Sequence, residues 1–297
     1  MDKIIDFLRF RYIAIGVSLV LFSIFISSIV AAGGINWGID FVGGVKITAK
    51  FEESVTIGSI RDALNENNIS GMVQQIGKEK LNEYVISSKL LQAAGESAEK
   101  SADMLKSVIN TNFKNVEILG TETVGPAIGA FLKKSAIKLF SIAIVLMMLY
   151  LSFRFEIKYS VGAIVAVLHD ILLSFAFCGF ANIEIDIPVI AALLTIFGYS
   201  VNDTIVIFDR VRENTQIQSK QTLFEVVNKS ITQSISRTLL TSITTLFAVL
   251  ALYLLGGDVI SGFAAVLLFG IVIGTYSTIY IASPVVLGWE KLAAKKK

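Results

Sequence analysis

The chain has 297 residues, of which 54% are hydrophobic and 17% are charged, and its mean hydropathy is +0.70. This composition is too apolar for an ordinary soluble domain and indicates a membrane protein. The formal net charge of +2 gives no reason to expect a nucleic-acid partner, and the single cysteine, Cys178, excludes an internal disulfide.

Residues 12–33 form the first of six apolar runs that are long enough to cross a bilayer. This run is longer than the apolar part of a secretory signal, so we expect it to stay as a helix. The other five runs are 134–153, 159–180, 187–209, 235–255 and 260–287. The predicted fold class is an α-helical membrane protein with six transmembrane helices.

Residues 34–130 follow the first span and predict a small extracytoplasmic α+β domain. Strand-like segments at 45–51, 72–76, 84–88 and 116–124 alternate with helical segments at 56–68 and 98–110. The order β-α-β-β-α-β predicts a ferredoxin-like fold. The domain contains no histidine, cysteine or glycine-rich phosphate loop, so we expect no catalytic site in it.

Residues 131–290 are predicted to form a bundle of five transmembrane helices, after the cytoplasmic N-terminus and helix 1 in residues 1–33. A basic tail follows at 291–297. If the spans alternate, four basic groups fall on one side, which the positive-inside rule assigns to the cytoplasm; Lys133, Lys134 and Lys138 fall on the other side, after a long translocated domain where the rule is weak. We therefore expect both termini in the cytoplasm. These groups are Lys3, Arg9, Arg11, Arg154, Lys158, Arg210, Arg212, Lys220, Lys229 and Lys295 to Lys297.

The fourth span carries the acid Asp203, with Tyr199 one turn away and Asn202 and Thr204 beside it. A charged side chain inside a bilayer costs about 3 kcal/mol or more, so such groups are usually functional. We interpret Asp203 as a titratable site in the membrane. The alternative is an acid near a helix end that forms a structural pair.

The fifth span places Ser230, Ser234, Arg237, Thr241 and Thr244 at intervals of four and three residues, which makes one polar stripe along a helix. We expect the stripe to face the bundle interior, with Arg237 paired to Asp203. The alternative is that the hydroxyl groups only hold helices together.

The third span contains the only histidine of the chain, His169, next to Asp170. If Asp170, Asp203 and Arg237 share one cavity, the cluster has one net negative charge, and one bound proton neutralises it. The alternative is a hydrogen-bonded structural pair. The sequence contains no nucleophile–base set, metal spacing or nucleotide loop, so we expect neither enzymatic activity nor a cofactor.

The chain resembles the SecD/SecF family of protein-translocase subunits, and more specifically its SecF members. The resemblance rests on residues 38–44, 124–126, 198–214, 236–238 and 241–245. This family is similar to the resistance-nodulation-division transporters, which use proton-titrating groups in their membrane helices. The resemblance implies that Asp203 and Arg237 lie on a proton path that an acid of a SecD partner completes. Asp170 and His169 lie in a matching third-span segment, where the match is looser.

The resemblance further implies a multi-pass protein of the cytoplasmic (inner) membrane in a bacterium or archaeon. Its expected partners are SecD, the SecYEG channel with its accessory membrane subunits, translocating preproteins and the lipid bilayer. The leading hypothesis is an accessory subunit that uses proton flow to promote late steps of preprotein export; sodium could replace the proton. One alternative is half of a small-molecule exporter from the same superfamily, against which the short outer domain argues. The other is a passive scaffold.

Overall fold

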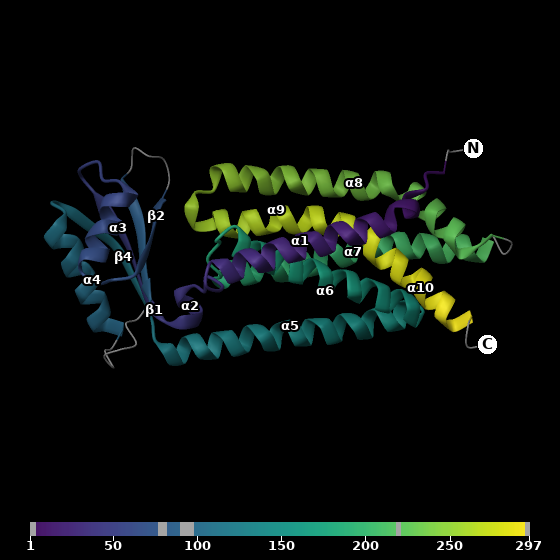
Figure 1. Ribbon diagram of the computed structural model, residues 1–297, viewed down its shortest axis with the longest axis horizontal. Helices are drawn as coiled ribbons and strands as arrows, with labels where there is room; N and C mark the ends of the chain where they lie inside the picture. Colours follow the sequence, from purple (N-terminus) through teal and green to yellow (C-terminus); the bar gives the residue numbers. More distant parts are fainter. Residues whose placement is uncertain (1–3, 77–81, 90–97, 218–220, 295–297) are drawn as a thin grey trace.

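The computed structural model describes residues 4–76, 82–89, 98–217 and 221–294. The predicted cytoplasmic lysines Lys3, Lys220 and Lys295 to Lys297 lie outside these residues. The described chain is elongated, with a helical bundle at one end and a small sheet domain at the other (Figure 1).

Within the described residues, six helices or helix combinations are long and apolar enough to cross a membrane, which confirms the predicted spans. Several are longer than predicted. The fourth span has 31 residues, about 46 Å at 1.5 Å per residue, and therefore extends beyond a hydrocarbon core of about 30 Å. The elements are η1 (Phe7–Phe10) with α1 (Arg11–Ala31), α5 (Pro126–Arg154), α6 (Ile157–Phe180), α7 (Ile187–Ile217), α8 (Leu223–Leu255), and α9 (Asp258–Ser277) with η4 (Thr278–Ala282) and α10 (Ser283–Ala294).

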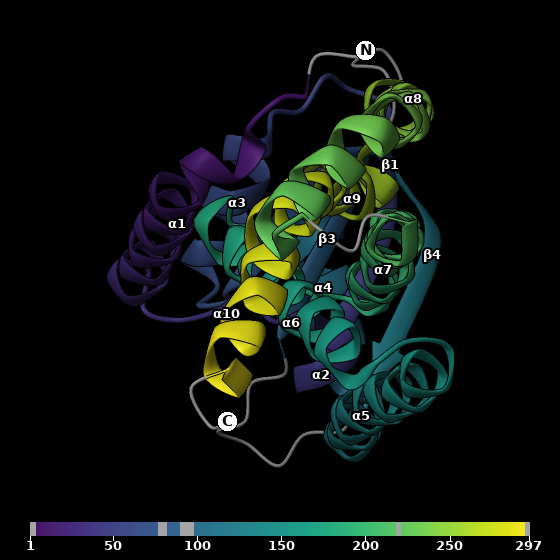
Figure 2. The ribbon, with the colours of Figure 1, turned by 90° about the vertical axis from the view of Figure 1, so that its right-hand side faces the viewer.

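Helices α6 and α7 form the centre of the bundle. Half of the residues in their spanning windows are buried, against 6% for α5. The end-on view shows α6, α7 and α9 close to the axis, with α1, α5 and α8 outside them (Figure 2). Helix α5 therefore presents most of its apolar surface outward, as expected for a helix that contacts lipid or a partner chain.

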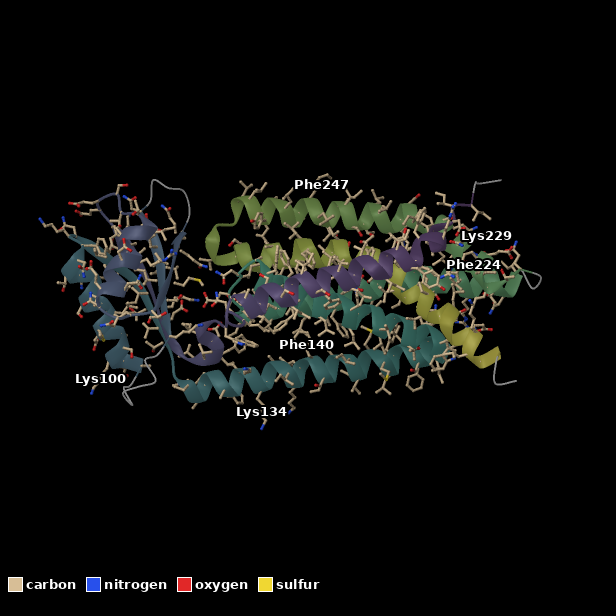
Figure 3. The ribbon with its side chains drawn as sticks, in the orientation of Figure 1. Lys100, Lys134, Phe140, Phe224, Lys229 and Phe247 are labelled. Carbon is tan, nitrogen blue, oxygen red and sulfur yellow. The ribbon has the colours of Figure 1, made fainter. Side chains whose placement is uncertain are left out.

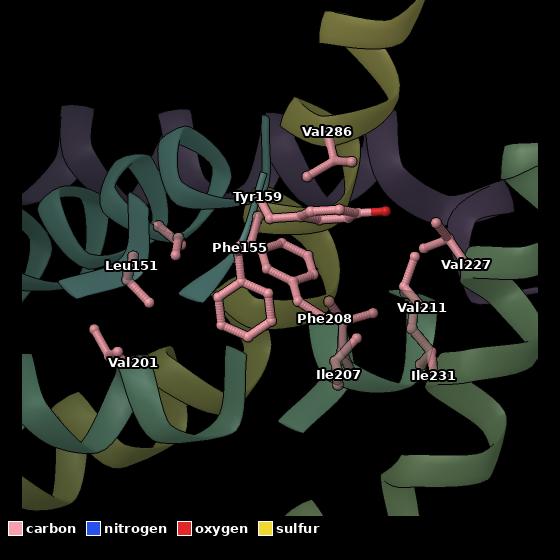
Figure 4. Packing of buried hydrophobic residues seen from close by; sticks show 14 of the residues in the cluster. Leu151, Phe155, Tyr159, Val201, Ile207, Phe208, Val211, Val227, Ile231 and Val286 are labelled. Atoms are coloured by element: carbon pink, nitrogen blue, oxygen red, sulfur yellow. The ribbon is translucent and has the colours of Figure 1, made fainter. Parts of the chain in front are cut away.

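The bundle end far from the sheet is closed by an apolar core. Tyr159, Phe208, Val211, Ile231 and Val286 come from four helices and are at most 2% exposed (Figure 4). The last span reaches this core through η4, a π-helical turn at Thr278–Ala282. A π turn contains more residues than an α turn and so changes the direction in which the following side chains point.

The outer domain is a four-stranded antiparallel sheet with the strand order β2-β3-β1-β4. Its two long helices occur in the predicted β-α-β-β-α-β order and lie on the face of the sheet away from the bundle (Figure 1). The ferredoxin-like assignment itself stays a prediction. The elements are β1 (Gly44–Phe51), α3 (Ile57–Glu66), β2 (Gly71–Ile76), β3 (Glu83–Lys89), α4 (Ala98–Asn112) and β4 (Val116–Val124). Helix α5 begins at Pro126, directly after β4, so the predicted division at residue 130 falls inside this helix.

A short segment with α2 (Ile39–Val42) joins the bundle to the sheet. Its backbone pairs with the α6–α7 loop, because Gly38 N donates to Ile185 O at 2.8 Å. The side chain of Asp40 accepts a hydrogen bond from Ile187 N, the first residue of α7, at 3.0 Å. The segment ends in two glycines: Gly43 has a φ of 81°, and a Cβ on Gly44 would lie 2.5 Å from Ser88 O. The outer end of α7 is thus connected directly to the central strand β1.

Candidate ion-path site in the membrane bundle

Asp170 lies at the centre of the bundle and is completely buried. Its Oδ1 is 2.9 Å from His169 Nδ1. Its Oδ2 accepts hydrogen bonds from Ser200 Oγ of α7 and Ser277 Oγ of α9, both at 2.6 Å. One carboxyl group thereby connects α6, α7 and α9, and both of its oxygens have short contacts.

The network continues from His169 to the first span. His169 Nε2 is 3.0 Å from Ser18 Oγ, and Ser18 Oγ is 2.9 Å from the hydroxyl of Tyr276. Because Tyr276 donates its hydrogen to the carbonyl of Ala14, it must accept from Ser18. The hydrogen of Ser18 is then in use, and the contact with His169 requires a hydrogen on Nε2.

This donor count fixes how many protons the His169–Asp170 pair holds. With a hydrogen on Nε2, a neutral imidazole would turn the lone pair of Nδ1 toward Asp170 Oδ1. A proton must therefore lie between these two atoms, on the ring or on the carboxyl. The pair has no net charge in either case.

Asp203 lies in a separate and sparser network on α7. It is 2% exposed, and its Oδ2 accepts one hydrogen bond, a long one of 3.4 Å from Ser242 Oγ of α8. Ser242 is also 2.8 Å from Thr275 Oγ1 and 3.4 Å from the hydroxyl of Tyr199. Ser242 has a single hydrogen to donate, so its bond to Asp203 competes with its contact to Thr275.

The structure does not bring Asp203 and Arg237 into direct contact. Among the described residues they form no ion pair, and Arg237 lies on the exposed surface of α8. Ser242 is the α8 residue opposite Asp203, and Arg237 precedes it by five residues, about 7.5 Å along the helix. The predicted Asp203–Arg237 pair is therefore not formed within this chain, because α8 places Ser242 and not Arg237 opposite Asp203. The assignment of both residues to an ion path stays a prediction.

Asp170 and Asp203 do not share one hydrogen-bonding site, so the condition for a common cluster with Arg237 is not met within this chain. Ser200, which donates to Asp170, and Asp203, which accepts from α8, are three residues apart on α7. Although this spacing puts both residues on one broad side of α7, Ser200 contacts α6 and Asp203 contacts α8. Arg237 instead lines a cavity of about 540 Å³ near the ends of α5, α7 and α8, and neither acid lines that cavity.

The predicted supporting residues divide into three groups by their exposure. Thr204 and Ser234 are buried, and Thr204 Oγ1 is 3.0 Å from Thr278 Oγ1. Tyr199 is half-buried, as its hydroxyl reaches Ser242. The remaining predicted residues, which are Asn202, Thr241 and Thr244, are exposed.

The polar stripe on α8 therefore does not face the bundle interior along its whole length. Its first members, Ser230 and Ser234, are buried, whereas Arg237, Thr241 and Thr244 are exposed. In the membrane part of α8 the buried hydroxyl residues are instead Thr238 and Ser242. The reason is that α8 packs its adjacent face against α7 and α9.

Sequence analysis found both acids and His169 but missed most of their partners. The missed groups are hydroxyl residues inside apolar spans: Ser18, Ser200, Ser242, Thr275, Tyr276 and Ser277. Such residues often bond only to the carbonyl of their own preceding turn, so their presence in a span gives a weak signal. No group of three or more His, Cys, Asp or Glu side chains in the described part of the chain is placed to hold a metal ion.

A second charged region lies between the sheet and the outer ends of the spans. A cavity of about 520 Å³ there is lined by Asp40, Lys46, Glu122, Glu184 and Asp186, among others. Burial raises the pKa of the Glu184 and Asp186 carboxyls above the ordinary values, and the nearby Lys46 partly opposes this rise. The carboxyls of Glu184 and Asp186 are therefore more easily protonated than free ones.

Comparisons with known proteins agree with this architecture. Residues 104–292 match the family described as protein export membrane protein SecD/SecF, C-terminal, and residues 29–55 match the SecD/SecF GG motif. The protein translocase subunit SecF of Desulfurispirillum indicum is 35% identical over 96% of this chain and 92% of its own length. SecF of Escherichia coli O157:H7 is 37% identical over 99% of this chain and 90% of its own length.

A solved structure extends the likeness to three dimensions. The crystal structure of SecDF from Thermus thermophilus superposes with a TM-score of 0.83 at 35% sequence identity. The match covers 98% of this chain and 39% of that SecDF chain, which is much longer. The six spans, the GG-motif segment and near-full-length likeness to SecF proteins lead to one conclusion: this multi-pass membrane chain belongs to the SecD/SecF family of protein-export membrane proteins.

Proposed function

We propose that this chain is an accessory subunit of the Sec export machinery that uses transmembrane ion flow, with protons as the ion, to promote late steps of preprotein translocation. The observation that carries the proposal is the complete burial of Asp170 and the near-complete burial of Asp203 between membrane spans. Acids that are kept at this depth are costly and are typical of ion paths. The proposal assigns no covalent chemistry to the chain.

The fold offers a route from the ion path to the outer domain. Asp203 lies on α7. At the outer end of the same helix, Ile187 N donates a hydrogen bond to the side chain of Asp40 in the GG-motif segment. That segment continues directly into β1, the strand that pairs with both β3 and β4. A shift of α7 on protonation would therefore reach the sheet through hydrogen-bonded backbone.

We infer that a SecD partner covers the exposed polar surface of α7 and α8. Asn202, Arg237, Thr241 and Thr244 are exposed here although they belong to membrane spans. Polar groups in spans rarely face lipid. An acid from the partner next to Arg237 would replace the internal pair that this chain lacks. Partnership with SecYEG and with preproteins follows from the same proposal.

The orientation is also part of the proposal. The described ends of α1 and α10 lie together at the bundle end away from the sheet, which agrees with six spans (Figure 1). The basic residues Arg154, Arg210 and Arg212 gather at that end, which by the positive-inside rule supports a cytoplasmic position for it, with the spans in an inner membrane.

The test is preprotein export with Asp203→Asn, measured in membrane vesicles with and without a proton gradient. The matched control is Asp209→Asn, because Asp209 is an acid on the same helix whose side chain is 42% exposed. We expect Asp203→Asn to remove the stimulation by the gradient and Asp209→Asn to retain it. Undiminished, gradient-sensitive export with Asp203→Asn would exclude the mechanism.

The export assay and two further measurements separate the remaining alternatives. A passive scaffold predicts normal export by both variants once the complex assembles. A small-molecule exporter predicts drug accumulation in cells that lack the chain. Stimulation by a sodium gradient that Asp203→Asn abolishes would keep the site and change the ion.

A further inference from the structure

Ser242 of α8 contacts polar side chains of both neighbouring helices, α7 and α9. Its Oγ is 3.4 Å from Asp203 Oδ2 and 3.4 Å from the hydroxyl of Tyr199, both on α7, and 2.8 Å from Thr275 Oγ1 on α9. Ser242 is 3% exposed, whereas Phe247 of the same helix points outward (Figure 3). The serine therefore lies inside the bundle, behind the exposed polar surface that we assign to a partner.

The hydrogens of this cluster, as the side chains are placed, leave a charged Asp203 without a donor. Thr275 donates its one hydrogen to the carbonyl of Ile271 in its own helix, at 3.0 Å. The shorter contact between Thr275 and Ser242 then requires the hydrogen of Ser242. Asp203 has no other hydrogen-bond partner among the described residues. A protonated carboxyl fits this arrangement, because it can itself donate to Ser242 Oγ.

The same two hydroxyls serve the charged form of Asp203 if both turn around. Ser242 then donates its hydrogen to Asp203 Oδ2, and Thr275 donates its hydrogen to Ser242 and releases the carbonyl of Ile271. This carbonyl lies inside α9, where the backbone N–H of the next turn is still its partner. Each hydroxyl keeps its own hydrogen, so the change is one bond rotation in each side chain.

The charged groups around Asp203 do not supply this hydrogen bond. Arg237 of α8 forms no ion pair with any described residue, and α9 has no charged residue after Asp258. Asp170 is held in its own network, and the hydroxyl of Tyr199 donates to Ser242. The donor for a charged Asp203 within this chain is therefore Ser242.

We propose that Ser242 and Thr275 are positioning residues for proton exchange at Asp203: their hydroxyl hydrogens point away from the carboxyl while it is protonated and turn toward it when its proton leaves. This proposal rests on the proposed function, in which Asp203 exchanges the coupled proton. The proton that moves is that of the carboxyl, which passes to water in the ion path, and neither hydroxyl ionises. Helix α9 thereby responds to Asp203 through Thr275, and Ser277 of the same helix contacts Asp170.

The test uses the full chain, purified with the subunits that accompany it from the membrane, in detergent micelles. Infrared difference spectra between acidic and alkaline buffer show the C=O band of a carboxyl that changes its protonation, and the band that Asp203→Asn removes belongs to Asp203. The test variants Ser242→Ala and Thr275→Val each remove one hydroxyl at nearly constant volume. Ser23→Ala is the matched control, because Ser23 is a span serine that bonds to the carbonyl of Leu19 in its own helix. Thermal unfolding of each variant verifies that the fold is retained.

We expect the two test variants to shift the Asp203 band in opposite directions. Ser242→Ala removes the hydroxyl that the carboxyl binds, and a carboxyl with fewer hydrogen bonds absorbs at higher frequency. Thr275→Val frees the hydrogen of Ser242 to bond to the carboxyl, so the band moves to lower frequency. Ser23→Ala should leave the band in place. Shifts of the same sign, or no shift, would overturn the proposal, because a merely structural role gives no reason for opposite signs.

Gradient-stimulated export is the second readout. We expect Ser242→Ala and Thr275→Val to lower the stimulation about tenfold, as for the loss of one hydrogen bond to a charged group, and Thr275→Ser to retain it because the hydroxyl is kept. An equal loss in Ser23→Ala would overturn the proposal.

The two readouts separate the failure of this proposal from the failure of the proposed function. Full stimulation in Thr275→Val, together with its loss in Asp203→Asn, would overturn the positioning role and leave the proposed function intact. Gradient-sensitive export with Asp203→Asn would exclude the proposed function, and the infrared shifts would still decide whether the hydroxyls follow the carboxyl. Absence of a band that Asp203→Asn removes would overturn proton exchange at Asp203 and this proposal with it.

Discussion

Asp170 and Asp203 are both buried acids in membrane spans, yet their surroundings differ. Asp170 has contacts of 2.6 to 2.9 Å to His169, Ser200 and Ser277, whereas Asp203 accepts one hydrogen bond of 3.4 Å. A buried polar network whose donors and acceptors are all paired holds its helices in one arrangement. A buried acid with few hydrogen-bond partners is destabilised in its charged state. From this comparison we propose that Asp170 organises the bundle and that Asp203 is the group that exchanges a proton during translocation.

The largest expected effect is at Asp170. Asp170→Ala removes the acceptor of the Ser200 and Ser277 hydroxyls and the partner of His169 Nδ1, and should lower the free energy of unfolding by about 3 kcal/mol. Asp170→Asn has the shape of a protonated aspartic acid, can donate to His169 Nδ1, and should cost less than about 1 kcal/mol. Unfolding by a denaturing detergent in micelles measures both. Equal losses in the two variants would contradict a neutral His169–Asp170 pair.

A smaller effect is expected at the outer end of α7. Asp40→Ala removes the side chain that caps Ile187 N and should destabilise the chain by about 1 kcal/mol. If α7 transmits the response of Asp203, the same variant should also weaken gradient-stimulated export. The control is Asp62→Ala, an exposed acid on α3. Normal export with Asp40→Ala would show that the coupling uses another route.

Asp203 itself should contribute little to stability. Because its one hydrogen bond is long, Asp203→Ala should change the free energy of unfolding by less than about 1 kcal/mol while export loses its response to the gradient. The same detergent unfolding measures the first quantity. A loss as large as that of Asp170→Ala would remove the distinction between the two acids.

The smallest effect concerns the pH dependence of stability at the junction with the sheet. Burial raises the pKa of Glu184, so between its ordinary and raised values the folded chain binds more protons than the unfolded chain. Stability therefore falls as the pH rises through this window. Glu184→Gln should flatten this fall, as seen in unfolding temperatures measured across the acidic range. An unchanged slope would mean that Glu184 does not titrate there.

The spans and the outer elements could be predicted from the sequence because apolar run length and alternation directly reflect burial. Asp203, Asp170 and His169 could be picked out as candidate site residues because charged or titratable side chains are rare in membrane spans. Their partners could not, because a hydroxyl such as Ser200 or Ser277 looks the same whether it bonds to its own helix or across the bundle. The sequence periodicity could not predict which face of α8 points into the bundle. Arg237 and Thr238 are neighbours in the sequence, and only the packing of the helices decides which of them faces inward.

The π turn at Thr278–Ala282 has a consequence for the last span. It lies between Ser277, which reaches Asp170, and Val286, which fills the far core. One residue corresponds to about 100° of helix rotation, so a uniform α-helix could not aim both side chains as they are aimed here. The alignment of this span therefore depends on the additional residue of the π turn. Deleting Tyr280 would let this turn become α-helical, and either the contact of Ser277 with Asp170 or the packing of Val286 in the far core would then be lost.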